Sequence, residues 1–128
     1  MSDKIRVLII DDEADFCFFV QKNLVRDGRF DVLVATNGKD GINMAENEFP
    51  DIILLDLFMP DIPGEDVAAA LKENITTKDI PILFVTALAT NDDIVNRDEN
   101  KIGNNYIMPK PVRTKKLIET ILKILGRL

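Results

Sequence analysis

Reactive side chains follow four of the short aliphatic runs in this chain, each at the point where the run ends. Asp11 and Asp12 come after the first run, Asp56 after a run of four Ile and Leu residues, and Thr86 and Lys110 after the last two runs. Three carboxylates close together are costly unless a positive charge lies among them, and Mg²⁺ favours a few carboxylate oxygens plus water. A lysine and a hydroxyl are what an incoming phosphoryl group needs. These residues predict a magnesium-dependent site for phosphoryl chemistry.

Two hydrophobic periods alternate along the chain. Short aliphatic runs predict strands that are buried on both faces, and apolar residues at helical spacing predict helices between them. The expected strands are 5–10, 30–35, 51–57, 82–85 and 106–108. The expected helices are 14–26, 39–48, 64–74, 91–102 and 114–125.

This alternation predicts the α/β class, with a doubly wound, five-stranded parallel sheet and five helices, because parallel neighbours need a crossover between them. Sheets of this kind bind ligands at the carboxyl edge of their strands. A single Asp at a strand end is most often a turn or cap residue. Four strand ends that agree are better explained by a site, so the reactive residues are expected to meet at one edge.

Length and charge limit the other possibilities. The 128 residues predict one domain over residues 1–128, with a core of about 4–125. The formal charge of −6, from 16 basic and 22 acidic residues, argues against binding nucleic acid or an anionic membrane through overall charge. The start of the chain lacks the features of a secretory signal, and no apolar run approaches the roughly 20 residues that span a bilayer. We therefore expect a cytoplasmic protein.

Several residues have plain structural interpretations. Cys17 lies in an apolar helical stretch and is expected to be a small core residue, since one cysteine cannot form an internal disulfide. Glu13 is expected to be only a first-turn charge of the helix that follows. The chain has no GxGxxG and no GxxxxGK[ST] motif, so the usual glycine-rich nucleotide loops are not predicted.

The order and spacing of the reactive residues resemble the response-regulator receiver domain of two-component signalling, in a chemotaxis-regulator-like form with the flavodoxin-like fold. The likeness covers residues 4–125. The matching pieces are Asp11-Asp12, Asp56 with Met59-Pro60 and Gly64, Thr86-Ala87, and Lys110-Pro111.

The resemblance implies a role for each site residue. Asp56 would accept a phosphoryl group from a phosphohistidine of a histidine kinase or a phosphotransfer protein. Asp12, Asp56 and the backbone carbonyl of Phe58 would bind Mg²⁺ directly, with Asp11 acting mainly through water. Thr86 and Lys110 would each contact one phosphoryl oxygen, and a cis peptide would join Lys110 to Pro111.

The resemblance also implies partners and a mode of action. A receiver catalyses only its own phosphorylation and dephosphorylation, and it would switch its surface for a downstream protein target, as a monomer or a phosphorylation-dependent dimer. The last helix leaves no room for an output domain before Leu128. We expect either a stand-alone receiver that acts by docking or a piece of a longer chain.

Two other functions remain open from the residues alone. A magnesium-dependent phosphohydrolase with an aspartyl nucleophile would need a second carboxylate two residues after Asp56, and Phe58 occupies that position. A receiver-like interaction module would keep the fold without being phosphorylated. The chain contains no histidine, so it cannot itself be a phosphohistidine donor.

The chain departs from the family pattern three residues before the lysine, where receivers usually carry an aromatic residue. Ile107 stands there, and Tyr106 precedes it. Because side chains alternate along a strand, the two should face opposite sides of the sheet, unless Pro109 marks a bulge that shifts the register. We expect Ile107 to carry a movement of Thr86 to the helix at 91–102.

Overall fold

The strands form one sheet whose neighbours are parallel except at one edge. The computed structural model describes residues 3–87, 101–102 and 105–127. The strands are β1 (Ile5–Ile10), β2 (Phe30–Ala35), β3 (Ile52–Leu55), β4 (Ile82–Thr86), β5 (Lys101–Ile102) and β6 (Asn105–Pro109). Their order across the sheet is β2-β1-β3-β4-β6-β5, and only β5 pairs antiparallel, with β6. The predicted sheet of five parallel strands is therefore confirmed, with a two-residue strand added at one edge.

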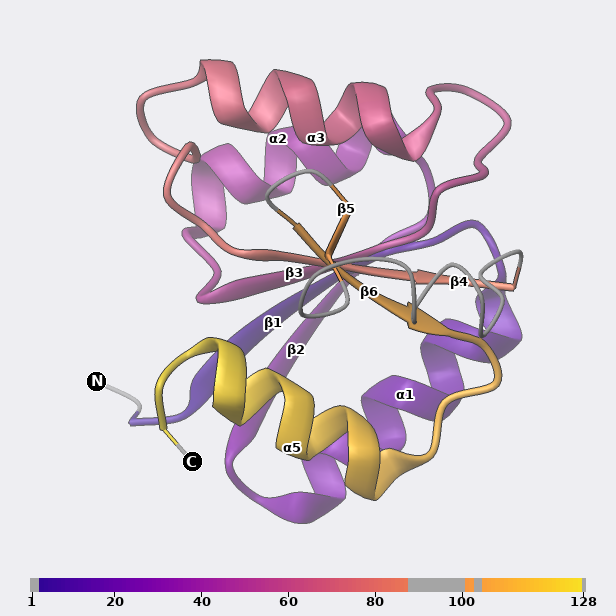
Figure 1. Ribbon diagram of the computed structural model, residues 1–128, viewed down its shortest axis with the longest axis vertical. Helices are drawn as coiled ribbons and strands as arrows, with labels where there is room; N and C mark the ends of the chain where they lie inside the picture. Colours follow the sequence, from indigo (N-terminus) through magenta and orange to yellow (C-terminus); the bar gives the residue numbers. More distant parts are fainter. Residues whose placement is uncertain (1–2, 88–100, 103–104, 128) are drawn as a thin grey trace.

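Helices cover both faces of this sheet in three layers (Figure 1). They are α1 (Ala14–Asp27), α2 (Gly38–Glu48), α3 (Gly64–Glu73) and α5 (Thr114–Ile124). The α2 and α3 helices lie on one face, and α1 and α5 lie on the other. No helix in the described ranges is both long and apolar enough to span a membrane.

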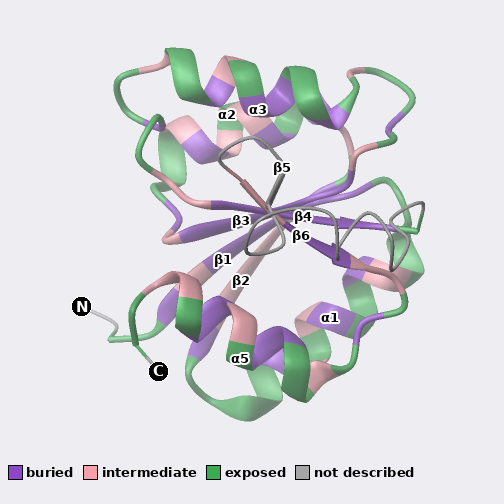
Figure 2. Ribbon diagram, viewed as in Figure 1, coloured by how far each residue is buried: buried purple, intermediate pink, exposed green. Residues whose placement is uncertain are grey.

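The central strands β1, β3 and β4 are buried almost throughout, as their continuous aliphatic runs predict, whereas β2 and β6 are partly exposed (Figure 2). Alternate strand residues supply two separate cores. The core under α1 and α5 contains Val7, Leu24 and Ile121. The core under α2 and α3 contains Leu8, Leu71 and Phe84. The sheet is thus held from both sides, which fixes the positions of its strand ends.

The structure corrects two predicted boundaries. The strand predicted at 51–57 is only Ile52–Leu55, because the register with β1 covers these four residues and the register with β4 covers Ile53–Leu55. Of the helix predicted at 91–102, residues 91–100 lie outside the described residues. The prediction is wrong for Lys101 and Ile102, since these two residues pair with β6 as strand β5.

Candidate functional site

Parallel pairing of β1 with β3 brings two carboxylates together at the carboxyl edge of the sheet. The N–H of Asp56 donates to the carbonyl of Ile10 at 3.0 Å, and the N–H of Asp11 donates to the carbonyl of Ala35 at 3.0 Å. These bonds continue the strand pairing one residue beyond each strand. Asp11 is 1% exposed and Asp56 is 6% exposed. Both carboxylates are therefore held at a nearly buried edge where an unpaired charge is costly.

Asp12 completes an acidic trio with Asp11 and Asp56. One carboxylate oxygen from each of the three residues lies within 4.8 Å of the other two. Asp12 is exposed, so the trio opens to solvent on its side. Hard oxygen donors that converge next to water are what Mg²⁺ requires, since this ion binds a few carboxylates and keeps several waters. The residues present therefore fit the predicted metal.

Lys110 supplies the positive charge beside the trio. Its Nζ lies 2.8 Å from Oδ2 of Asp11 and 3.7 Å from Oδ2 of Asp56. The ammonium also pairs with the carboxylate of Glu13 and lies 4.3 Å from the centre of the Phe16 ring. Only 8% of the lysine side chain is exposed. The ammonium is consequently fixed on several sides within reach of a group on Asp56.

Burial and close ion pairs shift the pKa values of Asp11 and Lys110. Burial raises the pKa of Asp11 above its usual value, although hydrogen bonds from Lys110 and from the Glu13 N–H act in the opposite direction. Burial lowers the pKa of Lys110, but its hydrogen bonds to Asp11 and Glu13 outweigh this effect and raise it overall. Four carboxylates thus face one ammonium, and a further cation would stabilise the group.

Thr86 and Lys110 lie on neighbouring strands. Thr86 ends β4, is buried, and pairs with Pro109 across the sheet. Its carbonyl accepts a hydrogen bond from the Lys110 N–H at 3.0 Å. The peptide between Lys110 and Pro111 is cis, which confirms the expectation from the resemblance. The structure therefore brings Asp11, Asp12, Asp56, Thr86 and Lys110 to one edge of the sheet.

The loop after Asp56 passes close to the backbone of the next helix. The Gly64 N–H donates to the carbonyl of Leu57 at 2.8 Å. A Cβ on Gly64 would lie 2.1 Å from the carbonyl oxygen of Asp56, so only glycine fits at this position. Phe58 lies in this loop with an exposed side chain. The role of its carbonyl as a metal ligand stays a prediction.

Asp61 ties the same loop to α2, which sequence reasoning missed. Its two carboxylate oxygens accept hydrogen bonds from the N–H groups of Gly38 and Lys39, at 3.0 and 3.1 Å. These bonds, that of Gly38 first, lower the pKa of Asp61. An Asp that follows a Pro in a polar loop is an ordinary turn residue. Nothing in its local sequence indicates that it caps a helix formed 22 residues earlier.

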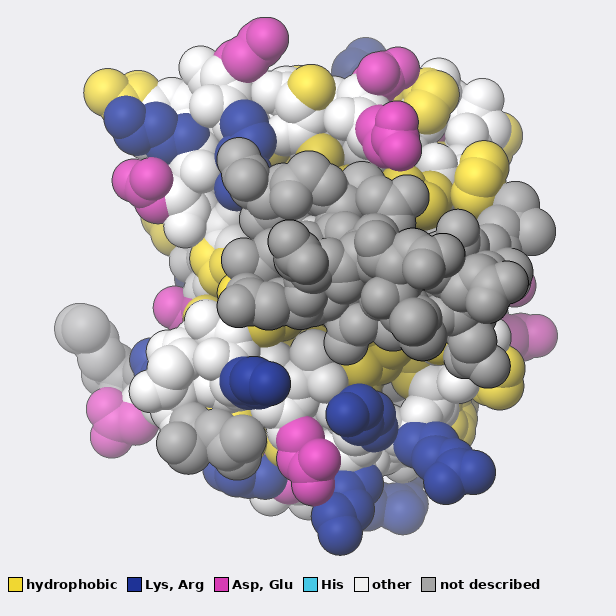
Figure 3. Space-filling view, in the orientation of Figure 1, with side chains coloured by type: hydrophobic (Ala, Val, Ile, Leu, Met, Phe, Trp, Pro, Cys, Tyr) yellow, Lys and Arg dark blue, Asp and Glu magenta, His cyan; other side chains and the backbone are white. Residues whose placement is uncertain are grey.

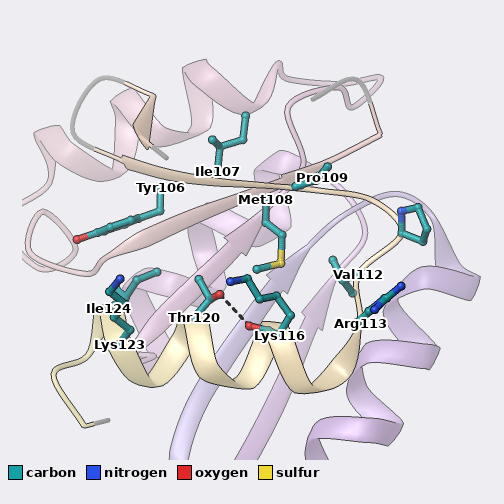
Figure 4. A pocket seen from close by; sticks show the side chains of 11 residues that line it. Tyr106, Ile107, Met108, Pro109, Val112, Arg113, Lys116, Thr120, Lys123 and Ile124 are labelled. Atoms are coloured by element: carbon teal, nitrogen blue, oxygen red, sulfur yellow. Dashed lines mark hydrogen bonds between the residues drawn. The ribbon is translucent and has the colours of Figure 1, made fainter. Parts of the chain in front are cut away.

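Tyr106 and Ile107 face opposite sides of the sheet, as predicted. Ile107 belongs to the core under α2 and α3, whereas Tyr106 packs against the core under α1 and α5. Figure 4 shows Tyr106 and Met108 pointing toward α5 and Ile107 pointing away. The pairing from Leu83 with Tyr106 to Thr86 with Pro109 is regular, so there is no bulge that shifts the register.

A cavity of about 630 Å³ lies between β6 and α5 (Figure 4). Met108 and Val112 give it apolar lining, and Arg113, Lys116 and Lys123 also line it. Lys and Arg side chains gather over this part of the molecule in the space-filling view (Figure 3). None of the five predicted site residues lines this cavity.

The structure confirms one prediction for a residue near the site and contradicts another. Cys17 is buried, and its Sγ donates to the carbonyl of Asp11 at 3.4 Å, so its prediction as a core residue is confirmed. Burial, followed by the charge of Asp11, raises the pKa of Cys17 to about 11. The prediction for Glu13 as a mere helix charge is wrong, because its carboxylate pairs with Lys110.

Comparisons with known proteins agree with this geometry. Residues 7–122 match the response regulator receiver domain. The chain is 32% identical over 121 residues to Protein PilH of Pseudomonas aeruginosa, covering 94% of this chain and 98% of PilH. It is 33% identical to the alkaline phosphatase synthesis transcriptional regulatory protein PhoP of Bacillus subtilis, covering 95% of this chain and 49% of PhoP. The chain spans about half the length of several curated relatives that it matches.

Solved structures show the same fold. The signal receiver domain of a LuxO repressor protein from Vibrio parahaemolyticus superposes with a TM-score of 0.78 at 28% identity, covering 97% of this chain and 92% of that one. Chemotaxis protein CheY4 of Vibrio cholerae superposes with a TM-score of 0.80 at 24% identity, covering 94% of this chain and 98% of that one. The family match over residues 7–122 and the likeness to PilH along nearly its whole length show that the chain belongs to the response regulator receiver domain family.

Proposed function

We propose that the protein is a phosphoacceptor, in which Asp56 takes a phosphoryl group from a phosphohistidine of a histidine kinase or phosphotransfer protein. One observation carries this proposal. The nearly buried Asp56 carboxylate lies 3.7 Å from the Lys110 ammonium and within 4.8 Å of oxygens of Asp11 and Asp12. A carboxylate placed among one cation and two further acids is positioned for charge-neutralised attack on phosphorus.

The chemistry needs position and charge more than acid or base groups. An Oδ atom of Asp56 forms a bond to phosphorus while the P–N bond of the phosphohistidine breaks, and the released imidazole keeps that electron pair. The Lys110 ammonium pairs with one phosphoryl oxygen, and the Thr86 hydroxyl donates a hydrogen bond to another. This step uses no water and leaves the phosphoryl group on Asp56. The protein therefore catalyses only its own modification.

Asp11, Asp12, Asp56 and the Phe58 carbonyl are the groups proposed to hold Mg²⁺. When bound, the ion would neutralise phosphoryl charge and help to orient the oxygens. Asp12 is the exposed member of the trio, so it offers its carboxylate on the open side. Asp11 already pairs with Lys110 at 2.8 Å, so its contact with the metal is proposed to be weaker and mediated by water.

The site is open to a donor protein at the ends of its strands. Phe58 and Ala87, which follow Asp56 and Thr86, are exposed, as is Asp12. A histidine side chain from another protein can therefore approach Asp56 from this edge. The downstream partner is proposed to be a protein that distinguishes the phosphorylated form.

Transfer to Asp56 is tested with acetyl phosphate and Mg²⁺, followed by intact mass spectrometry. The native protein is expected to gain one phosphoryl group, and Asp56→Asn none, because the amide is not a nucleophile. Asp79→Asn is the matched control, since Asp79 is exposed and precedes β4 at the opposite edge of the sheet. Phosphorylation of Asp56→Asn to the native extent would refute the assignment.

The same measurement separates the alternative functions. A phosphoacceptor accumulates one adduct per chain. A phosphohydrolase releases phosphate continuously without a lasting adduct, and an interaction module does neither. Removing Mg²⁺ with EDTA is expected to abolish the adduct while leaving the fold intact by circular dichroism.

A further inference from the structure

Glu13 makes a contact that its position in the helix does not require. It occupies the N-cap of α1, yet its side chain makes no capping hydrogen bond. N-cap side chains usually accept a hydrogen bond from the first turn. The Glu13 carboxylate instead pairs with the ammonium of Lys110, 97 residues later in the chain. Its N–H donates to Oδ1 of Asp11 at 2.9 Å, which fixes the backbone from which the side chain extends.

The contacts of Lys110 are unevenly distributed among its acidic neighbours. Glu13 and Asp11 are within hydrogen-bond distance of Nζ. Asp56, at 3.7 Å, lies beyond a direct hydrogen bond. The Phe16 ring, with its centre 4.3 Å from Nζ, is a further attractive partner. The ammonium has three N–H donors, and its shortest contacts are directed away from the acceptor.

This distribution has a kinetic consequence. An interaction that stabilises the starting state but not the transition state slows a reaction. During transfer the ammonium must serve an oxygen of the phosphoryl group on Asp56, so a pair with Glu13 competes for it. Glu13 is 58% exposed, which lets its carboxylate return to water when the ammonium is released.

We propose that Glu13 is a positioning residue that holds the Lys110 ammonium in the unphosphorylated protein and releases it when Asp56 is phosphorylated. This inference rests on the proposed phosphoacceptor function. It predicts that loss of the contact speeds phosphorylation of Asp56. Partly exposed ion pairs correspond to about a two- to fivefold change in an equilibrium or rate.

Three variants test the contact. Glu13→Gln removes the charge at nearly constant shape. Glu13→Asp keeps the charge but shortens the side chain by one methylene, which takes the carboxylate away from Lys110. Asp15→Asn is the matched control, because it removes one exposed acid from the first turn of the same helix. A thermal melt of each variant confirms that it folds.

The measurement is the rate of adduct formation with acetyl phosphate and Mg²⁺, at low and at high salt. We expect Glu13→Gln and Glu13→Asp to react about two- to fivefold faster than the native protein, with Asp15→Asn at the native rate. A general charge effect would speed Asp15→Asn as well and would fade at high salt.

The outcomes decide the proposal. Equal acceleration in Glu13→Gln and Asp15→Asn would mean that charge alone acts, and it would overturn the role of the contact. A native or slower rate in Glu13→Gln would overturn it too, since Glu13 would then assist Lys110 or do nothing. A native protein that gains no adduct would instead refute the proposed function, and this inference with it.

Discussion

The two faces of the sheet are packed in different ways. On the α2 side the helix backbone lies directly against a strand side chain, because a Cβ on Gly41 would lie 2.6 Å from the side chain of Ile10. Under α1 and α5 large side chains such as Leu24 and Phe30 fill the space. The backbone of α2 at Gly41 thus packs against a side chain, whereas α1 packs through its own side chains.

The same difference extends to the site. On the α2 and α3 face, backbone groups help to hold the loop after Asp56. The Gly64 N–H donates to the carbonyl of Leu57, and the Asp61 carboxylate accepts from the N–H of Gly38. Glu13 and Phe16 hold Lys110 on the α1 face through side chains alone. Side-chain pairs can exchange partners without moving the chain, whereas close backbone contacts transmit displacement. The two sides therefore hold the site through different kinds of contact.

The largest effect on the contrast between the two faces is expected for the substitution Gly64→Ala. Its Cβ would collide with backbone atoms of Asp56 and Leu57, which cannot rotate away. We expect the free energy of unfolding to fall by about 3 kcal/mol or more, with loss of phosphorylation, as measured by urea unfolding and intact mass. Gly28→Ala is the control, because Gly28 has a φ of 95° but no atom within 4 Å of a Cβ. A loss in Gly64→Ala no larger than in this control would show that the loop yields easily.

Substitutions at Ile107 and Tyr106 are expected to have smaller effects, which differ because the two residues face opposite sides of the sheet. Ile107→Val removes one methyl group from the core under α2 and α3, and we expect a loss of about 1 kcal/mol in unfolding free energy. Amide hydrogen exchange should then rise in α3, whereas Tyr106→Phe should leave α3 at native protection. If Tyr106→Phe changed exchange in α3 as much as Ile107→Val, the two faces would not act separately.

The smallest expected effect concerns Asp61 and pH. Because its pKa is lowered below 3.8, the Asp61 carboxylate stabilises the folded state above that pH, and this contribution is lost as pH falls through the folded-state pKa. Asp61→Asn should therefore be less stable than the native protein at neutral pH and equal to it in acid. Urea unfolding at pH values on both sides of 3.8 measures the difference, with Asp79→Asn as a control. A gap that persists in acid would mean that shape rather than charge matters.

Sequence reasoning predicted the sheet and the five site residues because both follow from local patterns. Aliphatic runs such as Ile52–Leu55 mark buried strands, and parallel strands place their ends at one edge. It missed partners whose contact arises only in three dimensions. Glu13 pairs with Lys110 across 97 residues, and Asp61 caps α2, which precedes β3 in the chain. Neither has a neighbour in sequence that indicates its role.

Sequence reasoning also could not show how much space is available at each backbone position. The motif around Asp56 includes Gly64, but only the structure shows that the glycine is needed because the chain passes 2.1 Å from where a Cβ would lie. The strand at Lys101 and Ile102 is two residues long, which is too short for any periodicity to appear.

The wide separation of Lys110 from the acids has a consequence for protein synthesis. A ribosome releases Asp11, Asp12 and Asp56 before Lys110, because chains emerge from the N-terminus. A nascent chain therefore carries the acids for some time without the ammonium that neutralises them, and pairing of such distant strands is slow. The site therefore assembles only after residues 105–110 have emerged and β6 has paired with β4.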